Sequence, residues 1–102
     1  MVTACSDGAR DKDCAAAVLA ALEVRNLTPL LDEVCRRRGV VRQDVCGRTR
    51  SLSVSRARQE LWWRIRNQAD RHYSLSEIAS LFCRDHTTVR HGIGAHQGRA
   101  VP

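Results

Sequence analysis

The most restrictive feature of the sequence is a pair of short helical patterns separated by a turn, between Ser74 and His91. Ser74 and Glu77 have the Ser-x-x-Glu spacing of a capping box, in which each side chain hydrogen-bonds a backbone N–H at the start of a helix. Four apolar residues at helical spacing then give this helix one apolar face: Leu75, Ile78, Ala79 and Phe82. Residues 74–91 therefore predict two helices joined by a tight turn, as in a helix-turn-helix.

The second helix of the pair begins with polar side chains and has apolar residues only on its inner face. Asp85 is placed to cap it, while Val89 and Ile93, four residues apart, face the core together. Polar side chains on the outer face of such a helix are suited to reading base edges in the DNA major groove. Three residues take that outward position: His86, Thr87 and Arg90.

A helix is also predicted over residues 11–25. The segment is rich in alanine, and it has acidic residues near its start and Arg25 at its end. This order of charges complements the helix dipole. Its apolar face carries four residues: Ala15, Val18, Leu19 and Leu22.

The next helix is predicted over residues 29–38. Thr28 is a suitable N-cap, Pro29 suits the first helical position, and Gly39 after three arginines is a typical stop. A short helical turn at residues 42–46 follows. The buried face of the helix should hold Leu30, Leu31, Val34 and Cys35.

A basic loop and a long helix come next. Residues 47–53 contain two arginines, three hydroxyl side chains and no apolar period. Ser53 or Ser55 is placed to cap a helix that ends near Asn67, and Trp63 lies outside its apolar stripe. The stripe consists of Ala57, Leu61, Trp62 and Ile65. Three arginines are left for solvent or phosphate: Arg58, Arg64 and Arg66.

These patterns predict an all-α protein, because no segment has a strand pattern or an internal repeat. A chain of 102 residues can bury one modest core. We expect an acidic N-terminal segment with one helix at 1–27, a helical domain at 28–97 and a flexible C-terminus at 98–102. The last boundary follows from Gly92 and Gly94, each of which costs a helix about 1 kcal/mol relative to alanine.

Charge is distributed unevenly along the chain. The net charge of +6 favours a polyanionic partner. Residues 1–35 hold three basic and six acidic side chains, a net charge of −3, whereas residues 36–102 hold fourteen arginines and five acidic side chains, a net charge of +9. Lys12 is the only lysine; arginine suits contacts to phosphate and guanine, although a GC-rich genome also enriches arginine and alanine. The two parts should therefore have different functions.

Cysteine usage and motif content argue against a metal site and against catalysis. The five cysteines are odd in number and form no Cys-x-x-Cys pair, so we expect reduced cysteines that act as small apolar residues. Cys83, His86 and His91 are candidate metal ligands by residue type, but we do not expect a metal site there, since histidines five residues apart splay around a helix. No nucleophile or carboxylate pair accompanies these histidines, so we expect neither an enzyme nor a cofactor.

The sequence also carries no sign of a membrane segment. No apolar run approaches the roughly 18 residues that a spanning helix needs, and the N-terminus has no signal-peptide pattern. We expect a cytoplasmic, nucleoid-associated protein.

Residues 28–96 closely resemble the C-terminal DNA-binding domain, domain IV, of the bacterial replication initiator DnaA. The resemblance rests on residues 53–59, on residues 74–78 and above all on Phe82 with Arg-Asp-His-Thr-Thr-Val at 84–89 and His91, directly after a capped amphipathic helix. It implies a compact helical domain with a helix-turn-helix of the Trp-repressor and DnaA domain IV type, and double-stranded DNA as the partner. The phosphate-binding Gly-x-x-x-x-Gly-Lys-Ser/Thr motif of the full initiator is missing, so no nucleotide is expected.

The resemblance also implies contact residues. Arg50 would enter the minor groove, and the start of the second helix would read the major groove, where Asp accepts from cytosine, Thr packs on thymine methyls and His donates to purines. The expected base contacts come from Arg50, Asp85, His86, Thr87 and Thr88. The expected contacts to the DNA backbone, which fix register, come from Arg48, Arg56, Arg58, Gln59, Ser76, Arg84, Arg90 and His91.

Three departures from the family pattern bear on base preference. Only Cys83 separates Phe82 from Arg84, where the family commonly has two glycines, so the turn is one residue shorter. The loop at 70–73 is about two residues longer, and Leu52 stands where a second basic residue is common. We therefore do not equate the target with the initiator's own box.

Two functions follow. The first is a stand-alone DNA-binding regulator of replication or transcription, or an accessory of a phage or mobile element. The alternative is an interaction module whose acidic N-terminal helix and Trp63 dock on the replication initiator or its regulators, with DNA binding weakened. Under the first function, a chain without residues 1–26 should still bind DNA, provided that Val18, Leu19 and Leu22 do not pack into the main core.

Overall fold

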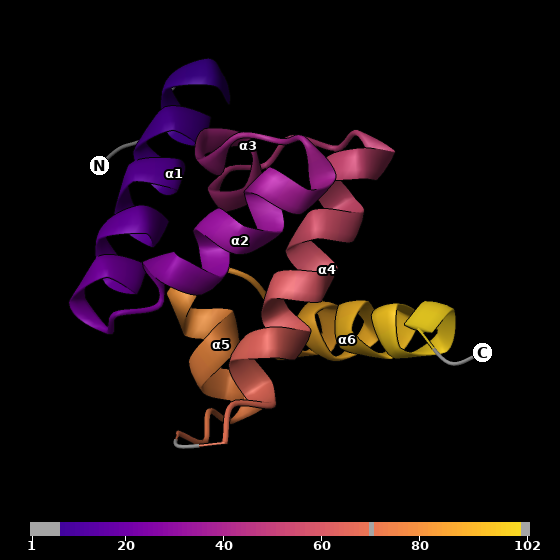
Figure 1. Ribbon diagram of the computed structural model, residues 1–102. Coiled ribbons are helices and arrows are strands. Elements are labelled where there is room, and N and C mark those ends of the chain that lie inside the picture. The colour runs from indigo at the N-terminus through magenta and orange to yellow at the C-terminus, as the bar shows by residue number, and fades with distance from the viewer. Residues whose placement is uncertain (1–6, 70, 101–102) are drawn as a thin grey trace.

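The helix that carries the apolar stripe of residues 57–65 lies at the centre of the fold. A computed structural model describes residues 7–69 and 71–100, and within these ranges it contains only α-helices and no strand. The helices are α1 (Asp7–Val24), α2 (Thr28–Arg38), α3 (Arg42–Cys46), α4 (Leu52–Arg66), α5 (Leu75–Leu81) and α6 (His86–Ala100). Figure 1 shows α4 between α2 and α6, with α1 at the edge beside α2. The predicted all-α fold is confirmed.

The predicted stripe of α4 is buried along its whole length. Ala57, Leu61 and Ile65 are fully buried, and the Trp62 ring meets Phe82 of the α5 end edge-on, with ring centroids 5.9 Å apart. A Cβ atom built on Gly92 would lie 2.6 Å from a Trp62 ring carbon, so only glycine allows α6 to approach α4 this closely. The packing of α4 against α5 and α6 thus fixes where the second helix of the pair lies.

Helix α1 belongs to this core. It begins at Asp7, four residues before the predicted start, and Val18 and Leu22 have no exposed surface. Leu19 is half-buried against the same core. Because α1 packs on α3 and also contacts α2 and α5, the condition for removing residues 1–26 without harm is not met. The expectation that a chain without residues 1–26 still binds DNA was tied to this condition and therefore does not apply.

The helix ends show which local signals act. The capping box of α5 is present: Ser74 Oγ accepts from the Glu77 N–H (3.1 Å), and a Glu77 carboxylate oxygen accepts from the Ser74 N–H (2.8 Å). Gly39 ends α2 in the left-handed conformation, φ 67°, as predicted. The predicted bounds of α3 are confirmed.

Other predicted ends were wrong. The N-cap of α2 is the buried Leu27 and has no side-chain cap, whereas Thr28 is already helical. The cap of α4 is Ser51, whose Oγ accepts from the Val54 N–H (3.3 Å), so the helix begins at Leu52, ahead of Ser53. Helix α6 continues to Ala100 despite its glycines, and residues 101–102 lie outside the described residues.

Candidate nucleic-acid interface

The N-terminal half of α6 presents the predicted reading surface. Asp85, His86, Thr87 and Thr88 are all exposed, while Val89 directly behind them is fully buried. The Asp85 carbonyl accepts from the Val89 N–H (3.2 Å), which places Asp85 at the N-cap position. The polar side chains at the start of this helix therefore face solvent, while Val89 packs the helix against the core. Its free N–H groups and dipole favour an anion nearby.

A left-handed residue forms the turn between α5 and α6. Cys83 has φ 55°, a conformation that non-glycine residues rarely adopt. The turn is closed by the Arg84 N–H, which donates to the Ala79 carbonyl (2.9 Å). One left-handed residue thus serves where the related family commonly has two glycines. Cys83 is exposed, so it does not fit the expectation of cysteines buried as apolar residues, which Cys35 and Cys46 do fit.

The basic loop lies beside this turn. Arg48 and Arg50 are exposed, and Arg84 Nη2 donates to the Gly47 carbonyl at the start of the loop (3.0 Å). Burial lowers the pKa of Arg84, and the positive charges of Arg48 and Arg50 lower it further. Because arginine stays charged even so, three guanidinium groups gather near the start of α6. Such a cluster attracts phosphate.

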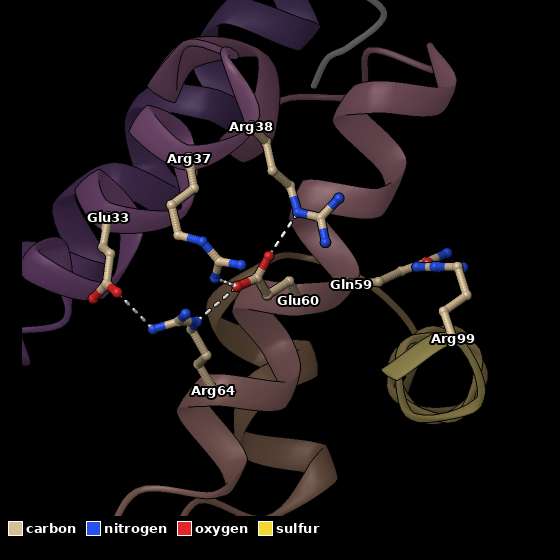
Figure 2. Close-up of polar contacts among 7 residues, drawn as sticks. All are labelled: Glu33, Arg37, Arg38, Gln59, Glu60, Arg64 and Arg99. Carbon is tan, nitrogen blue, oxygen red and sulfur yellow. Dashed lines mark hydrogen bonds and ion pairs between the residues drawn. The ribbon is translucent and has the colours of Figure 1, made fainter. Parts of the chain in front are cut away.

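A cleft of about 420 Å³ separates the first half of α4 from α6. It brings together predicted residues from three parts of the chain: Arg58, Gln59, Arg84, Thr88 and His91. Gln59 Oε1 accepts from Arg99 Nη2 of α6 (2.6 Å), and Figure 2 shows the ends of these two side chains together. Ser55 also lines the cleft, and sequence reasoning had considered it only as a cap. Its spacing of four from Gln59 on α4 was the available signal.

Arg58 does not lie where the sequence pattern put it. The prediction left it for solvent or phosphate, but its residue surface is only 5% exposed. Its guanidinium donates to backbone carbonyls at the end of α3 and in the basic loop. Because Nε and Nη2 are engaged by these carbonyls, the prediction that Arg58 is left for solvent or phosphate was wrong.

The remaining predicted contact residues lie outside the cleft between α4 and α6. Arg56 is exposed on α4, and Ser76 is exposed on α5. Arg90 lines a different cleft, with Arg66 and Leu75, on the other flank of α6. The structure thus does not bring Arg90 and Ser76 into the cleft beside the basic loop.

A second arginine cluster, away from α6's first turn, is structural. The Glu60 carboxylate is 3% exposed and accepts from Arg38 Nε (2.6 Å), Arg64 Nε (2.8 Å) and Arg37 Nη1 (2.5 Å), as Figure 2 shows. Burial alone would raise the pKa of Glu60, but these hydrogen bonds and charges outweigh it and hold the pKa below its ordinary 4.5. Arg64 also pairs with Glu33 (3.2 Å). These contacts join α2 to α4.

Three predictions change with this packing. Arg64 is committed to carboxylates, and Arg66 Nη1 donates to the Tyr73 carbonyl (3.2 Å), so neither is simply left for solvent. The Trp63 ring packs on His96, with centroids 5.2 Å apart, and is partly buried against the core. Trp63 is therefore a core-edge residue.

The part of the chain that the structure describes offers little else as a site. It contains no cluster of three or more histidine, cysteine or acidic residues that could hold a metal ion. Its cysteines are free, and Cys5 lies outside the described residues. None of its helices is long and apolar enough to cross a membrane.

Comparison with known proteins agrees with this geometry. Residues 28–95 match the bacterial dnaA protein helix-turn-helix family. The match spans α2 through most of α6 and includes the basic loop, the turn and the exposed start of α6. No curated protein and no solved structure matches the chain.

Proposed function

The chain belongs to the bacterial dnaA protein helix-turn-helix family, and on that basis we propose that it is a sequence-preferring, non-enzymatic regulator that acts on double-stranded DNA in the nucleoid. Membership of this family indicates DNA binding. The regulated process would be replication or transcription, in the cell's own chromosome or in a phage or mobile element. The observation that carries the proposal is the exposed polar start of α6 directly beside an arginine-rich loop.

This arrangement suits two modes of contact. The proposed base contacts come from Asp85, His86, Thr87 and Thr88 in the major groove and from Arg50 in the minor groove. The proposed phosphate contacts come from Arg48, Arg56, Gln59, Ser76, Arg84, Arg90 and His91, which would fix the register of α6. The base contacts of α6 would then depend on the phosphate contacts, which hold the helix in position on the DNA.

The first test is a salt titration with a duplex selected from a random pool. About four or five neutralised phosphates give a slope of log K against log salt of roughly −4. A slope near zero would remove DNA from the function. With folding intact, that result would favour the alternative, a module that binds the replication initiator or its regulators, which a pull-down with the initiator would detect.

The second test separates base reading from charge. Thr87→Ala and His86→Ala should each weaken binding to the selected duplex by about 1–3 kcal/mol and leave binding to random duplex nearly unchanged. His72→Ala is the matched control, because His72 is also exposed but precedes α5. Equal losses on both duplexes would contradict the assignment of α6.

A further inference from the structure

The side chain of Arg58 hydrogen-bonds several backbone carbonyls beside the candidate interface. Its Nε donates to the Val45 carbonyl (2.9 Å). Its Nη2 lies within hydrogen-bonding distance of three more carbonyls, those of Asp44 (2.9 Å), Gly47 (3.0 Å) and Thr49 (3.2 Å). One buried cation thus contacts the backbone of a six-residue stretch, 44–49, from the neighbouring helix α4.

The first two of these carbonyls lie at the end of α3. The last four C=O groups of any helix lack partners within the helix, and α3 has only five residues, so Asp44 and Val45 belong to that set. The helix dipole also places partial negative charge at this end. The Arg58 guanidinium therefore satisfies these carbonyls and has its own charge offset by them.

The other two carbonyls belong to the basic loop. Gly47 and Thr49 flank Arg48, and Thr49 directly precedes Arg50. Holding alternate carbonyls restricts the backbone between them, and with it the directions in which both arginines leave the loop. The Gly47 carbonyl also accepts from Arg84, which precedes α6 (3.0 Å). The loop is thereby joined to the turn that carries the reading helix.

From this geometry we infer that Arg58 is a positioning residue: it sets the direction of Arg48 and Arg50 toward DNA without contacting DNA itself. The inference rests on the proposed function, since it assigns the loop arginines to the same DNA site. It assigns base preference in the minor groove to a buried side chain. A planar fork with several fixed donors suits this role, whereas a lysine ammonium is a single point of charge.

The test compares Arg58→Met with Arg56→Met, its exposed neighbour on α4. Without DNA, the amide order parameters of residues 48–51 in Arg58→Met should fall from the rigid range, about 0.85, to below about 0.6, and those in Arg56→Met should not change. On DNA, Arg58→Met should lower the preference for the selected duplex over random duplex by about tenfold, the equivalent of one lost base contact. Its salt slope should stay that of the parent.

Arg56→Met should do the reverse. It removes a surface cation, so the salt slope should become shallower by about 0.9 and both duplexes should lose affinity alike. If Arg58→Met changes the slope in this way while the loop stays rigid, Arg58 contacts phosphate and the inference is overturned. A rigid loop with unchanged preference overturns it too. If the loop becomes mobile in Arg58→Met but the parent chain itself binds no DNA, the proposed function is refuted, while the finding that Arg58 orders the loop still holds.

A second variant covers the case in which Arg58→Met does not fold. Arg58→Lys keeps a cation at the end of α3, so the helix should stay folded, but it cannot hold carbonyls on both sides of Arg48. We expect a loop of intermediate order and a smaller loss of preference, about threefold. Parent-like order and preference in Arg58→Lys would show that charge alone suffices and would overturn the positioning role.

Discussion

The approach of α6 to α4 at Gly92 gives the sharpest stability prediction. Alanine at either Gly92 or Gly94 gains about 1 kcal/mol of helix propensity. At Gly94 the added Cβ meets nothing within 4 Å, so the gain should appear as stabilisation. At Gly92 it would lie 2.6 and 2.7 Å from two carbons of the Trp62 ring. Trp62 is 3% exposed and its ring packs edge-on against Phe82, so the ring cannot move aside easily.

The contact should therefore cost about 1–3 kcal/mol, as overpacking of a core does. Since the propensity gain is common to both variants, the difference between Gly92→Ala and Gly94→Ala isolates this contact. Chemical denaturation should place Gly94→Ala about 0.5–1 kcal/mol above the parent in free energy of unfolding, and Gly92→Ala about 1–3 kcal/mol below Gly94→Ala. Equal stability of the two variants would refute the reasoning, because α6 would then not rest on the Trp62 ring.

Three further predictions concern the scaffold. Ser51→Ala should lose about 1 kcal/mol in a denaturant titration and Ser53→Ala under about 0.5, and the opposite order would contradict the α4 cap. Deleting residues 1–26 should abolish the cooperative thermal transition, because fully buried side chains of α1 are lost; a truncated chain that still melts cooperatively would show that α1 is dispensable. Glu60→Gln should destabilise at pH 7 by about 1–3 kcal/mol, less than for a fully buried pair because Arg37 is half exposed. Since the folded-state pKa of Glu60 lies below 4.5, its contribution is present above about pH 4.5 and is lost as pH falls further, so acid unfolding of the variant should be less steep than that of the parent.

Local signals made much of the fold predictable from sequence. The capping box at Ser74 and Glu77 and the stop at Gly39 depend on residues within one helical turn, and both are present. The buried stripe of α4 was predictable because periodicity alone selects one face. The start of α6 was predictable for the same reason, with Val89 buried and its polar neighbours exposed.

Features that depend on distant partners were not predictable in this way. Arg58 is a charged residue outside the apolar stripe, so solvent was the reasonable expectation, but its partners are carbonyls 9 to 14 residues away in the chain. From the sequence, Gly92 was expected only to destabilise its helix. The reason that glycine is needed there is the Trp62 ring, which lies on another helix, α4. Composition distinguished an acidic N-terminal segment, but it could not show whether the apolar face of α1 packs into the main core, where Ala15, Val18 and Leu22 are buried.

The burial of α1 has a consequence for how this sequence can be recombined. Val18 and Leu22 of α1 share a core with Leu31 and Val45, although only the latter two lie within residues 28–95. A substitution in α1 therefore acts on the stability of the entire helix-turn-helix. In a chimera that exchanged residues 28–95 for those of another family member, α1 would pack against core residues that differ from its own partners. Its loss of stability would measure how closely the two surfaces are matched.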